Sequence, residues 1–255
     1  HANSSTSAQI KIGTRYNNIN PLSGKLSSFT ATKTSTGELV RQYNLNHASG
    51  TTAYDSSGNG NDGTLQNGAA FVVDNTLPPE ADRLNLQGYT DDGGVLKPRD
   101  ESDPTNDIDG NPLQYSGSVY PRRPEYRNSY AASFDGSNDK ILIDGTSYAS
   151  KTKGKITGYF KTAASGARTI CAFTDESDTA SDLRILINSG KLALGIRNNS
   201  SNSFNASTVS TFNDGAWHSF AISCTDSGIT LTVDGDVQAV TYAAGNATTV
   251  KWIND

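Results

Sequence analysis

The sequence has no methionine and only two cysteines, Cys171 and Cys224, among its 255 residues. Two cysteines are too few for a disulfide-dense scaffold, and their spacing matches no zinc-binding pattern. Cys224 continues the apolar alternation of Phe220 and Ile222, which predicts a thiol buried in the core, with a disulfide as the alternative.

Long apolar runs and clustered basic residues are also missing. No stretch approaches the roughly 20 apolar residues of a membrane-spanning helix, so insertion into a membrane is not expected. The formal net charge is -5 and the Lys and Arg residues are scattered, so no basic stripe is present that could follow a phosphate backbone. Nucleic acid is therefore excluded as an expected partner.

The residues that are abundant point to an all-β fold. Hydrophobic residues make up 34% of the chain and charged residues 18%, and Ser, Thr, Asn, Gly and Asp dominate the rest. This composition is typical of many short strands joined by polar turns. A chain of this length fits one large β domain.

From about residue 130 onward, short alternating segments recur between turn signals, whereas helical periodicity is not sustained. Residues 183–187 and 192–196 flank Asn188-Ser189-Gly190 and predict a hairpin. Residues 220–224 and 229–233 predict a second hairpin, and the latter strand ends at the reversal signal Asp234-Gly235. Each strand has one apolar face, so these segments belong to antiparallel sheets with one face buried.

Residues 74–130 differ from this pattern because they hold seven of the eight prolines among many aspartates. We expect a long irregular insertion, and loops of such length are usually functional. Exposed aromatic rings with polar rims bind sugars, and the candidates here are Tyr115, Tyr120, Arg122 and Tyr126. The alternative is that these rings pack the insertion against the sandwich.

Three separated motifs resemble the laminin-G-like branch of the concanavalin A-like lectin/glucanase superfamily. They are the Gly- and Asn-rich turn of residues 54–65, the Phe-Asp-Gly segment of residues 133–141, and the Trp-His strand of residues 213–220 with the Val-Asp-Gly hairpin of residues 231–235. The resemblance implies an all-β, two-sheet antiparallel jelly-roll sandwich of the concanavalin A-like type, carrying the long insertion. It also implies structural roles for Trp217, His218, Asp234 and Gly235.

The order of the pieces departs from that family. The closing Ile-Gly segment and the Gly-Lys-Leu strand expected at the end of such a domain resemble residues 10–15 and 21–29 instead. We therefore expect residues 1–40 to be closing strands and residues 41–255 to form the rest of the laminin-G-like sandwich. Three hypotheses remain open: residues 1–40 close their own sandwich, that of a neighbouring subunit, or that of a preceding repeat.

The resemblance does not bring a catalytic site with it. Glycoside hydrolases of the superfamily use closely spaced carboxylates on one strand, and none of the five Glu residues lies in a Glu-x-Asp-x-x-Glu arrangement. The acidic cluster Asp175-Glu176-Ser177-Asp178 falls between predicted strands and is expected to be a solvated loop. His218 has no recognisable Ser and Asp partners. We expect no catalytic residues.

Calcium is the metal that the sequence could bind, because hard cations prefer several oxygen ligands. One candidate site is Asp55, Asn59 and Asn61, although these residues equally suit turns that bond their own backbone. The other is Asp107, Asp109 and Asn111, where Pro112 replaces the glycine and no Glu completes a calcium loop. Calcium is thus expected at most as a structural ion.

Together, these features predict a non-enzymatic structural or adhesive module of an extracellular, cell-surface or virion appendage such as a phage tail fibre. We expect self-assembly with identical subunits, completed by strand exchange, and binding to a surface glycan or receptor. The alternative functions are a calcium-dependent carbohydrate-binding lectin module and, with least support, a polysaccharide hydrolase.

Overall fold

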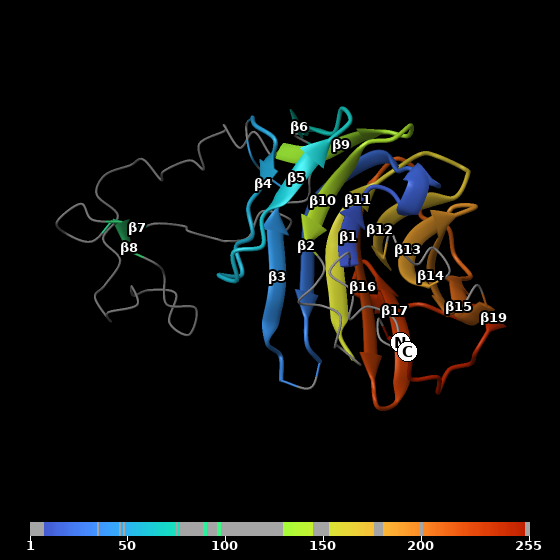
Figure 1. Ribbon diagram of the computed structural model, residues 1–255. Coiled ribbons are helices and arrows are strands. Elements are labelled where there is room, and N and C mark those ends of the chain that lie inside the picture. Colours follow the sequence, from blue (N-terminus) through green and yellow to red (C-terminus); the bar gives the residue numbers. More distant parts are fainter. Residues whose placement is uncertain are drawn as a thin grey trace, which may run out of the picture.

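The computed structural model describes residues 8–34, 36–45, 47, 49–74, 76, 89–90, 96–97, 130–144, 153–175, 181–198 and 201–252. Two antiparallel sheets face each other and enclose one hydrophobic core (Figure 1). The only helical element among these residues is the 3₁₀ turn η1 (Tyr16–Asn18). The predicted all-β, two-sheet antiparallel sandwich is confirmed.

The first sheet, sheet A, has nine strands in the order β19-β15-β14-β13-β12-β1-β10-β5-β4. Its strands are β1 (Ala8–Ile12), β4 (Thr52–Ala53), β5 (Gly63–Gln66), β10 (Lys140–Asp144), β12 (Arg168–Asp175), β13 (Asp182–Asn188), β14 (Lys191–Asn198), β15 (Ser201–Thr208) and β19 (Val240–Ala244).

The second sheet, sheet B, has eight strands in the order β18-β17-β16-β11-β2-β9-β6, with β3 also paired to β2. Its strands are β2 (Ser23–Thr32), β3 (Leu39–Asn44), β6 (Ala70–Val73), β9 (Tyr130–Asp135), β11 (Lys155–Lys161), β16 (Trp217–Thr225), β17 (Gly228–Val233) and β18 (Asp236–Val237). A separate two-stranded ladder of β7 (Tyr89–Thr90) and β8 (Leu96–Lys97) lies within the insertion, which is therefore not wholly irregular.

Alternation of apolar and polar residues sets which face of each strand enters the core. In β16, Phe220, Ile222 and Cys224 are buried while the residues between them are partly exposed. Both predicted hairpins form, with positive φ at Ser189-Gly190 in the first turn and at Gly228 in the second, while the left-handed turn of Asp234-Gly235 joins β17 to β18. Such turns match the twist of the strands that they join.

The N-terminal strands take interior positions in both sheets. β1 lies between β12 and β10 in sheet A, and β2 lies between β11 on one side and β9 and β3 on the other in sheet B (Figure 1). Ile10, Ile12, Leu26 and Phe29 on these strands are fully buried in the common core. Residues 8–32 thus supply an interior strand to each of the two sheets.

A buried polar cluster also ties the N-terminal segment to sheet A. Asp182 accepts hydrogen bonds from Nε of Arg15, from Nη1 of Arg184 at 2.8 Å and from Nε of Arg197 at 3.1 Å. The Asp182 carboxylate is completely buried. Because breaking a buried ion pair leaves an uncompensated charge, this cluster favours the arrangement in which the segment carrying Arg15 stays on β13.

Trp252 closes one end of the core and is fully buried. Its indole lies against Gly154, where an added Cβ would come within 2.6 Å of the Trp252 Nε1 atom. Glycine at position 154 therefore makes room for the ring.

Cys171 and Cys224 are both buried and both free thiols. Burial raises the pKa of the Cys171 thiol well above its ordinary value, so it remains protonated and unreactive at neutral pH. The prediction of a core thiol at position 224 is confirmed.

The insertion begins at a charged anchor. Asp74 follows β6 directly and accepts a hydrogen bond from Lys25 Nζ at 2.9 Å, while Lys161 Nζ lies 3.5 Å away. Burial raises the pKa of Asp74, but hydrogen bonds from Thr76 and Lys25 outweigh it, so the pKa of this carboxyl falls far below its usual value. This contact fixes the start of the insertion on the outer face of sheet B.

We expect Ile12→Ala to lower the free energy of unfolding by about 2–4 kcal/mol, because it leaves a cavity in a central strand. Leu194→Ala in β14 should cause a loss of similar size, since Leu194 is buried to the same degree. Urea denaturation monitored by fluorescence measures both. A loss below about 0.5 kcal/mol for Ile12→Ala alone would show that β1 is not part of the core in solution.

We expect Asp74→Asn to lower the free energy of unfolding at neutral pH by about 1–3 kcal/mol, the range for a charged hydrogen bond. The folded pKa of Asp74 lies below its usual value of 3.8, so its stabilising effect is complete above that pH and is lost as the pH falls through the folded pKa. The stability difference between the native protein and the variant should therefore shrink below pH 4. A difference that stays constant down to pH 2 would contradict the assignment.

Candidate functional site

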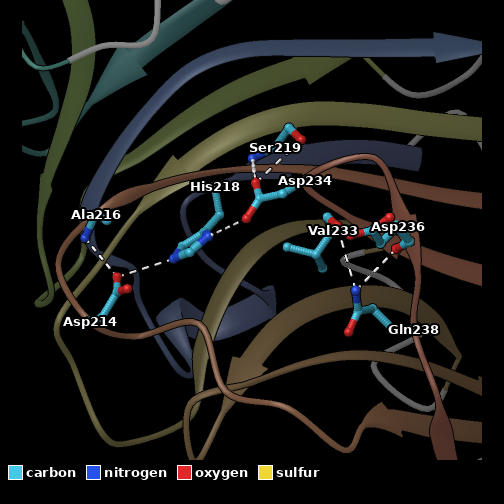
Figure 2. A network of polar contacts seen from close by, with 8 residues as sticks. All are labelled: Asp214, Ala216, His218, Ser219, Val233, Asp234, Asp236 and Gln238. Carbon is cyan, nitrogen blue, oxygen red and sulfur yellow. Dashed lines mark hydrogen bonds and ion pairs between the residues drawn. The ribbon is translucent and has the colours of Figure 1, made fainter.

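His218, near the start of β16, is the centre of a polar network (Figure 2). Its Nδ1 atom lies 2.7 Å from Oδ2 of Asp234, and its Nε2 atom lies 3.1 Å from Oδ1 of Asp214. Each ring nitrogen of His218 thus has a carboxylate oxygen as its hydrogen-bond partner. The ring packs between Phe160 and Phe212, with centroid distances of 5.7 and 5.4 Å.

This network joins two turns. Asp214 also accepts the backbone N–H of Ala216 at 2.7 Å, and this bond together with His218 lowers the pKa of the Asp214 carboxyl. Asp234 accepts the backbone N–H of Ser219 at 2.8 Å and occupies the left-handed turn position before Gly235. His218 thus fastens the turn before β16 to the turn after β17.

The same geometry lacks the arrangement of a hydrolytic triad. The Ser219 hydroxyl lies 3.4 Å from Asp234 Oδ1, and neither nitrogen of His218 has a hydroxyl partner. A general base needs one nitrogen directed at its nucleophile. The contacts of His218 and Asp234 agree with structural roles, Gly235 has positive φ in the turn after β17, and half-buried Trp217 begins β16 opposite Lys161. The structural roles of these four residues stay a prediction.

The turn of Asp55 to Asn61 covers the outer edge of β3. Asp55 Oδ1 accepts the backbone N–H of Gln42 at 3.1 Å, and Ser56 donates its N–H to the Gln42 carbonyl at 2.7 Å. The Asn59 side chain donates to the Val40 carbonyl at 3.0 Å. Unpaired strand edges recruit other strands, so this turn acts as a plug that blocks pairing at β3.

The residues of this turn do not fit a calcium ion as they are arranged. Asp55 Oδ1 also accepts the N–H of Ser57 at 3.0 Å, and Oδ2 accepts the N–H of Asn61 at 3.1 Å. Burial raises the pKa of Asp55, but these hydrogen bonds outweigh it and lower that pKa. N–H groups therefore occupy the positions on Asp55 where a cation would bind. Calcium at Asp55, Asn59 and Asn61 stays a prediction.

The remaining candidate residues lie outside the part of the chain that the structure describes. These are Asp107, Asp109 and Asn111 for calcium, and Tyr115, Tyr120, Arg122 and Tyr126 for glycan binding. Among the described residues, no group of three or more His, Cys, Asp and Glu side chains could hold a metal ion.

Sequence patterns did not predict the cluster of Asp182 with its arginines or the anchor at Asp74. Arg184 and Arg197 alternate with buried apolar residues in β13 and β14, which would have placed both on the outward face of one sheet. Their meeting with Arg15 depends on the path of residues 13–22, which no local pattern predicts.

We expect Asp55→Ala to lower the free energy of unfolding by about 1–3 kcal/mol, because it removes the acceptor of three backbone N–H groups. It should also expose the edge of β3 and increase aggregation, measured by light scattering during urea titration. Asp236→Ala, which changes an exposed aspartate on β18, is the matched control and should behave as the native protein. Equal behaviour of the two variants would contradict the plug.

Comparison with known proteins supports the family assignment. Residues 165–253 match the model of the Laminin G domain, a region that contains the Trp-His strand and the Val-Asp-Gly hairpin. Neither the curated proteins nor the solved structures give a significant match. Laminin G domains are generally binding modules and typically extracellular, and none of the described helical residues forms a segment long and apolar enough to cross a membrane. Residues 165–253 are thus similar to a Laminin G domain, and the two-sheet antiparallel fold agrees with this likeness.

Proposed function

We propose that this protein is a non-enzymatic structural and adhesive module of an extracellular or virion appendage, and that its copies join by exchanging their N-terminal strands. The observation that carries the proposal is the interior position of β1 and β2, which both sheets need and which the start of the chain supplies. A strand with this position can be provided in cis, as here, or by a neighbouring copy with the same contacts.

The same contacts make the exchange energetically neutral at the core. Ile10 and Ile12 bury the same surface and meet the same partners on β10 and β12 whichever copy supplies them. The balance between closed and exchanged forms then depends on concentration and on the segment leading to the next strand. An appendage built in this way gains strength from central strands rather than from surface contacts.

The adhesive part of the proposal rests on the binding character of laminin G domains and on the absence of a hydrolytic triad around His218. We propose a surface glycan or receptor as the target, with the tyrosines of the insertion as the candidate contacts. Release of reducing sugar from any polysaccharide would contradict the non-enzymatic assignment. A glycan signal that requires calcium would favour the lectin alternative.

Strand exchange can be tested by cross-linking across the pair Gln9 and Asp144, which face each other on β1 and β10. Opposite residues of antiparallel strands lie close enough for a disulfide. The double variant Gln9→Cys/Asp144→Cys should form an internal cross-link in closed monomers. Single variants Gln9→Cys and Asp144→Cys, refolded together at high concentration, should form a disulfide between chains, seen on non-reducing gels.

The control mixes Gln9→Cys with Asn67→Cys, because Asn67 is exposed and does not face β1. The buried native cysteines are kept in all variants. If the two single variants never cross-link to each other more than the control pair does, strand exchange is refuted, while the adhesive role remains open to the glycan test.

A further inference from the structure

Two turns that connect the sheets lie side by side at one flank of the sandwich. Residues 67–69 carry the chain from β5 in sheet A to β6 in sheet B, and residues 136–139 carry it from β9 in sheet B to β10 in sheet A (Figure 1). The end of β5 pairs with the start of β10, and the start of β6 pairs with β9 near its end, so the two turns are neighbours. The Asn67 side chain joins them by donating a hydrogen bond to the Asn138 carbonyl at 3.0 Å.

Asp139 places a buried carboxyl group between these turns. The residue is 2% exposed, and its Oδ2 atom accepts the backbone N–H of Asp135 at 2.9 Å. Its Oδ1 atom is also buried and has no hydrogen-bond partner among the described residues. A Cβ atom added at Gly68 would come within 2.8 Å of Oδ1, and Gly68 has a φ of +117°. Glycine allows both this φ and so close an approach, so the first turn is shaped to the Asp139 carboxyl group.

The charges on the neighbouring strands do not neutralise Asp139. Burial raises the pKa of Asp139, and repulsion from the Asp135 carboxylate adds to this, so the hydrogen bond from the Asp135 N–H does not bring the pKa back. Lys140 begins β10, but its Nζ atom lies 3.5 Å from Oδ1 of Asn18 on η1. The turn of residues 67–69 contains no charged side chain.

Among the described residues, the segment after β1 offers no cation to Asp139 either. Gly13 packs against the backbone of Asp139, where an added Cβ would lie 3.3 Å from the Asp139 carbonyl oxygen. The next cation in that segment, Arg15, binds Asp182. Asp74, which follows β6, differs because two lysines lie close to its carboxylate. Burial therefore favours the neutral form of Asp139, whereas the lysines favour the ionised form of Asp74.

We propose that Asp139 is a proton-dependent latch between the two turns. The neutral carboxyl group fits against Gly68 without a cation, whereas ionisation places an uncompensated charge there and loosens this flank of the sandwich. β6 and β9 are the strands that flank the insertion, and both reach the latch. The latch therefore holds these two strands together more firmly when Asp139 is protonated than when it is ionised.

The raised pKa of Asp139 sets the sign of the pH dependence. The folded chain binds this proton more tightly than the unfolded chain, so the cost of ionisation is absent below the usual pKa of 3.8 and complete above the folded pKa. Asp139→Asn keeps the size of the side chain and removes its charge. This variant should unfold at a higher urea concentration than the native protein at pH 7, and the two midpoints should converge at pH 3.

Two other variants serve as controls for the loss of a charge. Asp236→Asn should leave the urea midpoint unchanged at both pH values, because Asp236 is exposed on β18. Asp74→Asn should lower the midpoint at pH 7, since it removes a charge that lysines hold. A rise of the midpoint at pH 7 in Asp139→Asn alone therefore belongs to the latch.

NMR titration of the Asp139 carboxyl group in the native chain measures the latch directly. The titration midpoint should lie above 3.8, and the signals of the Asn67 side-chain amide and the Gly68 backbone amide should shift with the same midpoint. Asp135→Asn should lower this midpoint, because it removes the repulsion. A midpoint at or below 3.8, or turn signals that do not follow it, overturns the proposal even if Asp139→Asn does not fold. An Asp139→Asn variant that is less stable than the native protein by the same amount at both pH values overturns it too.

Discussion

The structure depends on two strands that come from the beginning of the chain and lie inside both sheets. Because β1 joins β10 to β12 and β2 joins β9 and β3 to β11, each sheet would be divided without them. The fully buried Ile12 and Phe29 show that the loss would reach the core and not only the backbone ladders. Hydrophobic burial and hydrogen bonding thus require the same segment, which makes folding of the rest conditional on it.

Polar contacts also hold the N-terminal segment in place. Arg15 reaches Asp182 from the segment between β1 and β2, and Lys25 at the start of β2 holds Asp74 at the start of the insertion. Arg15 and Lys25 are thus each matched by an aspartate that lies far along the chain. Removing Arg15 or Lys25 would take a cationic partner from a buried carboxylate, which is costly. The N-terminal segment is therefore positioned by charge as well as by shape.

Local patterns predicted much of this fold but little of its polar organisation. The alternation in residues 183–196 and 220–233 was sufficient for both hairpins because side chains in a strand alternate strictly between two faces. The resemblance at residues 10–29 pointed to strands, and β1 and β2 lie there, but which copy they close stays a prediction. The plug formed by Asp55 and Asn59 could be predicted only as a turn. The strand edge that it covers, that of β3, is a tertiary neighbour that no local pattern indicates. The polar network around His218 was not predicted for the same reason, since Asp214 and Asp234 come to His218 from two different turns.

The edge strands of the sandwich differ in how far they are open to pairing. The turn of Asp55 to Asn61, in which both carboxylate oxygens of Asp55 accept backbone N–H groups, covers the edge of β3. β4 and β18 are only two residues long and leave few unpaired backbone groups. β6 and β19 are longer uncharged strands at the ends of their sheets. β3 is the longest of these edge strands and pairs with β2, so covering its edge also protects the strand that holds the two flanks of sheet B together.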